Sequence, residues 1–270
     1  MSSGNLEAQV AAARAYEALF VPALFTQWVP IMVDAAQFTT GQTVLDVACG
    51  TGVLTRAAYE KVGPGGSVTG LDPGAGMLAV ARERCPSVHW REGVAESMPF
   101  GEGSYDAVVC QFGLMFMDQP RALREMLRVL RPGGRLAVAV WDSLENLPAF
   151  AAEVALLDRV AGARAADALR APFVLGDRKR LAGTFEEAGA GGVTIRTQQG
   201  VARFPSIRVL VEADLRGWLP LMGVHLAEDT IAGILDEAEN VLGPYATADG
   251  RVVFDAPAHI VTVDKPRAAT

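Results

Sequence analysis

Cysteine is scarce in this sequence, with three residues in 270 that lie far apart along the chain: Cys49, Cys85 and Cys110. Their odd number and wide spacing match neither a disulfide framework nor a zinc site. Proteins without disulfides are typical of reducing compartments, so the sequence predicts a cytoplasmic protein that holds no metal ion.

Positive charge is also in deficit. Lysine and arginine number 24 against 31 aspartates and glutamates, which leaves a net charge of −7. The densest basic run, Arg178-Lys179-Arg180, is short. Binding to a nucleic-acid backbone requires clustered lysine and arginine, so the sequence predicts no nucleic-acid partner.

A long uninterrupted hydrophobic run is missing as well. The first ten residues, MSSGNLEAQV, lack the basic start and apolar core of a secretion signal. The longest uncharged apolar stretch, Ala18 to Val33, contains Pro22 and Pro30 and is shorter than the roughly 20 residues that span a bilayer. The sequence therefore predicts no membrane partner, although its 50% hydrophobic residues can form a sizeable core.

Short apolar runs alternate with amphipathic ones in the first half of the chain. The apolar runs are nearly continuous, which is typical of strands buried on both faces. The expected strands are Val44–Ala48, Ser67–Asp72, Val88–Glu92, Tyr105–Phe112 and Arg135–Trp141. The expected helices among them are Val53–Lys61, Ala75–Arg84 and Arg121–Leu130. This alternation predicts an α/β fold with an open parallel sheet and right-handed crossovers.

The pattern changes after Trp141, where helices dominate. Only two later segments look like strands, Val193–Phe204 and Arg251–Val263. The expected helices are Leu147–Val160, Arg178–Ala188, Ile207–Leu219 and Ala227–Leu242, and residues 6–38 predict two more, broken near the two prolines. We expect an antiparallel sheet edge with an inserted helical cap.

The stretch VLDVACGTG, Val44 to Gly52, is a strand that ends in a glycine turn. In open α/β sheets, ligands bind at the carboxyl ends of the strands, where glycines let a ligand approach the backbone. A dinucleotide site needs a small third residue, but Thr55 stands there when the motif is read from Gly50. A P-loop needs a lysine followed by serine or threonine, and none follows. The turn is therefore not typical of a phosphate site.

Two acids accompany the turn. Asp46 would repel a pyrophosphate but can hold an ammonium group, which indicates a ligand with an amino-acid moiety. Asp72 ends the second strand, where an acid accepts hydrogen bonds from ribose hydroxyls. Together they indicate a nucleoside joined to an amino acid without phosphates, and S-adenosylmethionine fits that description.

Five motifs in this order resemble one enzyme family. They are VLDVACGTG, GLDPGAGML, AESMPF, DAVVCQFGLMFM and LRVLRPGGRLAVAVW, between about Thr43 and Trp141. They resemble the class I S-adenosylmethionine-dependent methyltransferases, in the group similar to ubiquinone and menaquinone biosynthesis enzymes. The resemblance implies a Rossmann-like seven-stranded sheet in the order 3-2-1-4-5-7-6, with the last strand antiparallel. It also implies a single domain over residues 1–270, with an N-terminal helical lid over 1–40 and cap segments at 145–175 and 205–248.

The resemblance also implies roles for individual residues. The methionine part of the cofactor would lie among Asp46, Ala48, Gly50 and Gly52, and Asp72 would bind the ribose. Met77 would pack on the adenine, with Ala95 and Glu96 at its edge. Gln111 and Phe112 would face the methyl group and the acceptor, and Tyr16 would close over the cofactor. Apart from the resemblance, Trp141 lies at the carboxyl end of the fifth expected strand, where it would line the pocket. Ala48 stands where the family has a glycine, a mild change, and Val94 stands where an aspartate is frequent, which weakens the assignment of Glu96.

Structural alternatives accompany several of these residues. Asp46 is also explained as a buried acid bonded to the backbone, Asp72 as a helix cap, Met77 as a core residue and Gln111 as a polar residue at a strand end. Among three histidines, His225 is the best candidate for a general base, whereas His259 is more typical of a structural role.

The predicted activity is methyl transfer to a small apolar or aromatic acceptor, at oxygen or carbon, by in-line displacement with S-adenosylhomocysteine as product. Apolar cap segments at Pro148–Leu157 and Gly217–Leu226 favour such an acceptor. The alternative is a non-catalytic S-adenosylmethionine-binding protein that acts as a partner or sensor. The sequence carries no signal of an oligomeric state.

Overall fold

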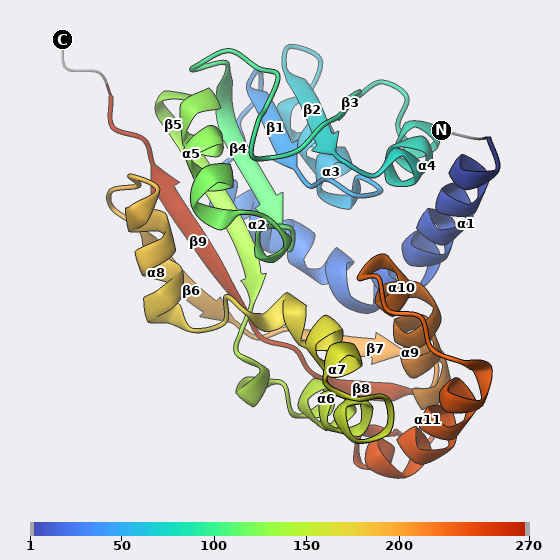
Figure 1. Cartoon of the computed structure of the whole chain (residues 1–270). Coiled ribbons are helices and arrows are strands. Elements are labelled where there is room, and N and C mark those ends of the chain that lie inside the picture. Colours follow the sequence, from blue (N-terminus) through green and yellow to red (C-terminus); the bar gives the residue numbers. More distant parts are fainter. Residues whose placement is uncertain (1–2, 268–270) are drawn as a thin grey trace.

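The computed structural model describes residues 3–267; residues 1–2, part of the expected lid, and 268–270 lie outside it. A seven-stranded sheet crosses the molecule in the order β3-β2-β1-β4-β5-β9-β6 (Figure 1). Neighbouring strands from β3 to β5 run parallel, and β9 is antiparallel to both β5 and β6. The strands are β1 Thr43–Val47, β2 Ser67–Asp72, β3 His89–Glu92, β4 Tyr105–Gln111, β5 Leu130–Trp141, β6 Thr194–Gln198 and β9 Ala258–Asp264. The predicted fold class and strand order are confirmed.

Helices cover both faces of this sheet (Figure 1). On one face α2 packs against α3, β4, β5 and β9, and on the other α5 packs against α8 and β5. These helices are α2 Val29–Ala36, α3 Val53–Val62, α5 Gln119–Val129 and α8 Arg178–Glu187. Val44, Leu45, Val108 and Val138 in the central strands are fully buried, as continuous apolar runs predict.

The two late segments that look like single strands are each two strands, which corrects the expectation. Residues 193–204 divide into β6 and β7 Val201–Phe204, and residues 251–263 divide into β8 Val252–Asp255 and β9. β7 and β8 form a separate antiparallel sheet. A Cβ on Gly200 would overlap the indole of Trp28, and the N–H of Ala256 donates to the carbonyl of Gly200. The chain therefore bends away from the large sheet at these two points.

The N-terminal segment also differs from the expected pair of helices. It comprises α1 Ser3–Phe20, a π-helical turn Val21–Phe25, a 3-10 turn Thr26–Trp28, and α2. Pro30 does not break the helix because it lies in the first turn of α2, where its missing N–H costs no hydrogen bond. α1 packs directly on α4 Ala75–Arg84, since a Cβ on Gly76 would overlap the backbone of Gln9.

The remaining helices gather around the small β7–β8 sheet, below the large sheet in Figure 1. We call this group the helical region. It comprises α6 Pro148–Ala161, α7 Ala163–Arg170, α9 Ile207–Ala213, a π-helical turn Asp214–Trp218, α10 Leu219–Leu221 and α11 Glu228–Val241. The helix α7 was not expected from the sequence, and the expected helix over residues 207–219 is interrupted by the π-helical turn.

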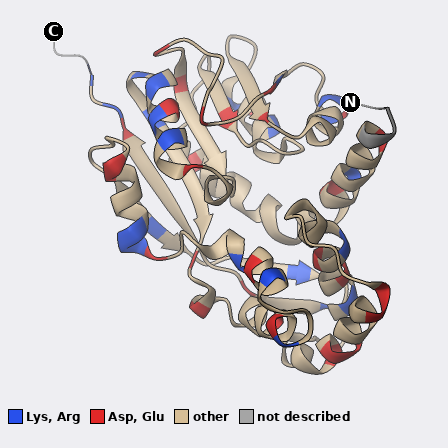
Figure 2. Cartoon of the chain, in the orientation of Figure 1, with Lys and Arg blue, Asp and Glu red and all other residues tan. Residues whose placement is uncertain are grey.

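Two surface properties bear on partners. By length and composition alone, the 31-residue run Leu6–Ala36 is apolar enough to cross a membrane, although the uncharged stretch within it is shorter. In the structure this run is divided at residues 21–28, and Trp28 and Met32 are fully buried. In the view of Figure 2, basic segments along α5 and at the start of α8 lie beside acidic ones. The absence of membrane and nucleic-acid partners stays a prediction.

Candidate functional site at the carboxyl ends of the strands

The glycine turn after β1 depends on three residues in the left-handed region of backbone space. Their φ angles are 56° at Ala48, 54° at Gly50 and 86° at Gly52. A side chain at such an angle costs roughly 1–2 kcal/mol, so the alanine at Ala48 is not the mild change expected from the sequence. A Cβ built on Gly50 meets no atom within 4 Å, which leaves open space against the backbone of the turn.

Asp46 lies buried in β1, directly before this turn. Its Oδ2 accepts a hydrogen bond of 2.5 Å from the hydroxyl of Thr55, in the first turn of α3. Burial raises the pKa of Asp46 to about 7, and the nearby charge of Asp72 adds to the rise while the bond from Thr55 lowers it. A cationic group near Asp46 would favour the carboxylate form.

Asp72 connects the end of β2 to the glycine turn. Its Oδ2 accepts from the N–H of Gly50 at 2.9 Å, and its Oδ1 accepts from the N–H of Gly74 at 2.8 Å. Gly74 is the N-cap of α4 and no side-chain hydrogen bond caps this helix, so the bond from its N–H to Asp72 is not a helix cap. Burial raises the pKa of Asp72, whereas these two backbone bonds lower it.

The helix α1 lies against this pair of acids. Tyr16 is close enough to Asp72 and Glu17 for both to raise its pKa, in addition to the larger effect of burial. The buried carboxylate of Glu17 accepts from the hydroxyl of Thr51 at 2.5 Å and from Arg56 at 3.2 Å. The N-terminal helix is therefore bonded to the glycine turn and to α3.

Aromatic rings from four segments meet beside the ends of β4 and β5. Phe112 stacks on Trp141 with ring centroids 4.0 Å apart, and Phe25 lies 5.6 Å from Phe112. Phe25 also contacts Tyr16 of α1 at 5.6 Å. Next to them, the side-chain N–H of Gln111 donates to the carbonyl of Phe25, and its Oε1 is buried without a donor in the described part of the chain.

The residues expected around the adenine differ in burial and in bonding. Met77 is half-buried on α4 beside Gly74, and Ala95 is buried in the loop after β3. The carboxylate of Glu96 accepts from the N–H of Asp118, the N-cap of α5, at 2.9 Å. Val94, which stands where an aspartate is frequent, is 47% exposed.

The histidines lie apart from the acids. His225 is exposed in the loop before α11, and within residues 3–267 no hydrogen bond or ion pair engages its ring. His259 is buried in β9, where both ring nitrogens have partners. His89 is exposed on the edge strand β3.

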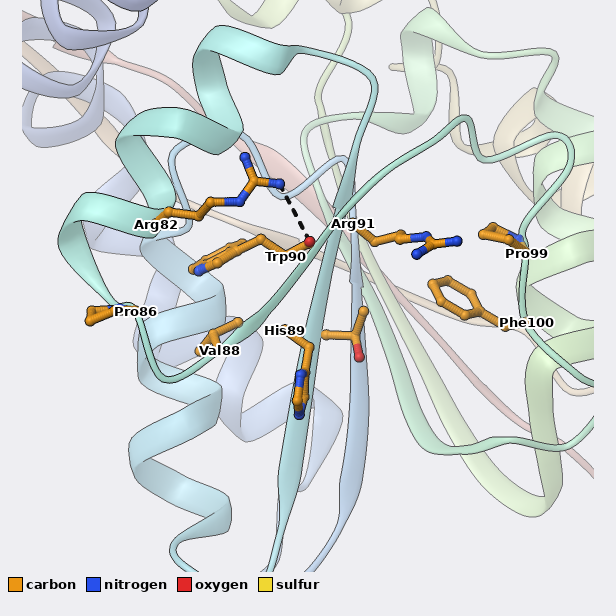
Figure 3. A pocket seen from close by; sticks show the side chains of 9 residues that line it. Arg82, Pro86, Val88, His89, Trp90, Arg91, Pro99 and Phe100 are labelled. Atoms are coloured by element: carbon orange, nitrogen blue, oxygen red, sulfur yellow. Dashed lines mark hydrogen bonds between the residues drawn. The ribbon is translucent and has the colours of Figure 1, made fainter.

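A surface pocket of about 710 Å³ lies along this edge strand (Figure 3). Trp90 and Arg91 point to opposite sides of β3 there, and neither Asp46 nor Asp72 lines the pocket. A Cβ on Gly52 or Gly70 would overlap the indole of Trp90, so this ring supports the glycine turn from behind. The pocket is separate from the acids.

A second pair of buried acids lies in the helical region and was not expected from the sequence. Burial is the main cause that raises the pKa of both Glu153 of α6 and Asp214 of the π-helical turn. The pKa of Asp214 rises to about 7, although Glu153 lowers it, and that of Glu153 rises well above its usual value, with Asp214 adding to the rise. Among the described residues, neither oxygen of Glu153 has a donor. Two neighbouring carboxylates disfavour each other's charge, so burial and proximity both favour the protonated form of Glu153.

The sequence predicted the residues at the strand ends but not the side chains that contact them. Asp46, Gly50 and Asp72 meet at one end of the sheet, as do Phe112 and Trp141, whereas His225 is not brought to either set. Glu17, Thr51, Thr55 and Phe25 were missed. A weak signal existed for the two threonines, which lie within and just after the glycine turn, but none existed for Glu17 and Phe25.

Comparisons with known proteins agree with this arrangement. Residues 44–134 match the family described as "Methyltransferase domain". A demethylmenaquinone methyltransferase of Paenarthrobacter aurescens is 35% identical over 189 residues, 64% of this chain and 72% of that protein. A 2-phytyl-1,4-naphtoquinone methyltransferase of Thermosynechococcus vestitus is 43% identical over 115 residues, 41% of this chain and 51% of that protein. The chain thus spans about half the length of some curated relatives that it matches.

Solved structures agree on the fold. The YcgJ protein of Bacillus subtilis has a TM-score of 0.58 at 20% identity, covering 90% of this chain and 99% of that chain. A Haemonchus contortus phosphoethanolamine N-methyltransferase in complex with S-adenosylhomocysteine has a TM-score of 0.60 at 18% identity, covering 96% of this chain and 58% of that chain.

Proposed function

Because this chain belongs to the class I S-adenosylmethionine-dependent methyltransferase family, we propose that it transfers a methyl group from S-adenosylmethionine to a small aromatic or apolar acceptor and releases S-adenosylhomocysteine. One observation carries the proposal. Two buried acids, Asp46 and Asp72, flank a glycine turn with open space above Gly50, and no lysine or arginine bonds to either acid in the described residues. These two acceptors suit a ligand that brings an ammonium group and ribose hydroxyls, and their negative charge disfavours phosphates.

The residues fit the cofactor part by part. Asp46, oriented by Thr55, takes the ammonium group, and the turn of Ala48, Gly50 and Gly52 lies along the amino-acid part. Asp72 exchanges its backbone partner at Gly50 for the ribose hydroxyls. The adenine side is assigned to Met77 and Ala95, with Glu96 a weaker member because its carboxylate bonds to Asp118.

When bound, the cofactor supplies a methyl group already activated by a sulfonium leaving group. The chain's own task is then alignment and exclusion of water. Phe112 and Trp141 form an apolar wall at the strand ends, and Tyr16 of α1 lies near Asp72. The ring of His225 is exposed, so the geometry favours methyl transfer without this residue as a base.

Two parts of the chain enclose the site in this proposal. Residues 1–40 act as a lid, supported by the bonds from Glu17 to Thr51 and Arg56. The segments 145–175 and 205–248 act as a cap, supported by the contact between Trp218 and Phe116, which follows β4, at 5.1 Å. The acceptor would lie between them, beside Phe112 and Trp141.

The acceptor is proposed to be a fused or single aromatic ring that is methylated at carbon or oxygen. The aromatic wall supports a flat ring. The names of two relatives, which act on a naphthoquinone and on demethylmenaquinone, point to the same chemistry.

The test is transfer of a tritiated methyl group from S-adenosylmethionine to a panel of reduced naphthoquinones and simple phenols. We expect labelled product with at least one aromatic acceptor, and none with apolar compounds that lack a nucleophilic ring. Tight cofactor binding without transfer to any compound would instead favour the non-catalytic binding protein. Loss of cofactor binding altogether would contradict both.

A further inference from the structure

His259 is the centre of a buried junction between four segments of the chain. Its Nδ1 lies 3.0 Å from the hydroxyl of Thr197, and its Nε2 lies 2.7 Å from the carbonyl of Gly176 and 3.2 Å from Oδ1 of Asp142. We call these four residues the His259 junction. The carbonyl and the carboxylate only accept hydrogen bonds, so Nε2 carries a hydrogen, and Nδ1 forms a hydrogen bond with the hydroxyl of Thr197.

This arrangement removes His259 from direct chemistry. Both nitrogens are engaged, and the ring is 1% exposed. An imidazole whose two nitrogens are both bonded within the protein has no site left for a substrate proton. Any effect of His259 on the site must therefore be exerted through the groups to which it is bonded.

Asp142 connects His259 to the aromatic wall formed by Phe112 and Trp141. It follows Trp141 in the chain, and its Oδ1 also accepts from the N–H of Ser143 at 2.7 Å and from the amide of Asn146 at 3.1 Å. Its own N–H donates to the carbonyl of Pro257 at 3.1 Å. The backbone after Trp141 is therefore held on several sides, and the Trp141 ring itself packs against Phe112 and Phe25.

Gly176 connects His259 to the helical region. A Cβ on this residue would overlap the backbone of Ser143, so the two segments touch through their main chains. The turn before Gly176, Ala171–Phe173, contacts the segment Leu114–Phe116 that follows β4. The ring of Phe173 also lies 5.3 Å from that of Phe150 in α6. The imidazole of His259 thus contacts both the residue that follows β5 and the segment where the chain leaves the helical region and returns to the sheet.

We propose that His259 is a positioning residue for methyl transfer: through Asp142 and Gly176 it orients Trp141 and holds the helical region at the acceptor side of the site. The inference rests on the proposed function, because Trp141 faces an acceptor only if the chain is a methyltransferase. It differs from a purely stabilising role, which would lower stability without a selective effect on the acceptor.

The test compares variants on the two sides of the imidazole in the full-length protein. His259→Leu removes all three contacts at similar volume, and His259→Gln keeps a donor in reach of Gly176 and Asp142. Thr197→Val is the matched control, because it removes only the hydroxyl bonded to Nδ1, on the other side of the ring from Asp142 and Gly176. Asn146→Ala, an exposed position bonded to Asp142, serves if His259→Leu does not fold.

Each variant is measured for binding of S-adenosylhomocysteine, for kcat and KM with the best acceptor of the tritium assay, and by near-ultraviolet circular dichroism. We expect His259→Leu to lower kcat/KM for the acceptor about tenfold to a hundredfold, because small displacements at a site of reaction cost that much. Binding of S-adenosylhomocysteine should stay within about twofold, and the aromatic dichroism should change. His259→Gln should recover most of the activity, and Asn146→Ala should share the defect at a smaller size.

Two results would overturn the proposal. One is an unchanged aromatic spectrum and acceptor KM in His259→Leu, with only a lower melting temperature. The other is an equal loss of acceptor kcat/KM in Thr197→Val. If the wild-type protein transfers no methyl group, the proposed function fails, while the dichroism still decides whether His259 orients the aromatic wall.

Discussion

Two pairs of buried acids lie in different regions of this protein, one at the glycine turn and one in the helical region, and their surroundings differ. Asp46 and Asp72, at the glycine turn, accept hydrogen bonds from a hydroxyl and from two backbone N–H groups. Glu153 and Asp214, in the helical region, have each other as the neighbouring acid, and the described residues offer Glu153 no donor. Burial raises the pKa of all four carboxyl groups.

The comparison teaches that burial and a raised pKa do not by themselves mark a ligand site. The first pair is oriented by groups that a ligand can replace or join, beside open space at Gly50. The second pair is enclosed, and among the described residues neither oxygen of Glu153 has a donor that a ligand could replace. The donors around an acid, rather than its depth, therefore distinguish a binding residue from an enclosed one.

The largest expected effect is on the first pair. Asp72→Ala should weaken binding of S-adenosylhomocysteine about a hundredfold, because it removes a charged acceptor worth roughly 1.5–3 kcal/mol. Isothermal calorimetry measures this directly. Glu92→Ala, an exposed acid at the end of β3, is the control and should change affinity less than about twofold. Unchanged affinity in Asp72→Ala would remove this acid from the proposed site.

A smaller effect is expected at the second pair. The raised pKa of Glu153 and Asp214 means that the folded protein binds more protons than the unfolded chain above the ordinary carboxyl pKa. This contribution to stability is present at low pH and is lost as pH rises through the folded pKa values, about 7 for Asp214. Glu153→Gln removes the acid and should raise the free energy of unfolding at pH 8 by about 1–2 kcal/mol.

Urea unfolding at pH 5 and pH 8 checks this expectation. The gain in Glu153→Gln should be larger at pH 8 than at pH 5, because at pH 5 the wild-type pair is already protonated. Cofactor affinity should not change, which separates the two pairs. An equal shift at both values of pH would show that the pair does not titrate in this way.

A third effect concerns the strained turn beside the first pair. Ala48→Gly should raise the free energy of unfolding by about 0.5–1 kcal/mol, since relief of the left-handed alanine exceeds the entropy that glycine adds to the unfolded chain. Thermal unfolding measures it. Ala79→Gly, within α4, is the control and should lower stability by about 1 kcal/mol. A loss of stability in both variants would contradict the strain at Ala48.

The smallest effect is expected at His225. Because its ring is exposed and unbonded within residues 3–267, His225→Gln should leave kcat and its pH profile within about twofold of the wild type in the tritium assay. A tenfold fall in kcat with unchanged cofactor binding would make His225 a general base after all.

The strand-end half of the molecule was largely predictable, and the helical half was not. The pattern of short apolar runs determined β1 to β5 to within a few residues, except that β5 begins at Leu130 rather than Arg135. The late strands were each taken as one because only two residues, 199–200 and 256–257, separate their halves. The bend is decided by Trp28, more than 170 residues away from Gly200.

By itself, the sequence determined the strand–turn–helix unit around Asp46 and its relation to Asp72, because these residues lie in neighbouring elements whose geometry follows from local pattern. Tertiary structure alone decided which side chains support that unit: Glu17 on Thr51, Phe25 on Phe112, and His259 on Asp142. It also decided that Glu153 meets Asp214 and that His225 is exposed. Such contacts join residues far apart in the chain, and no periodicity or motif within a segment records them.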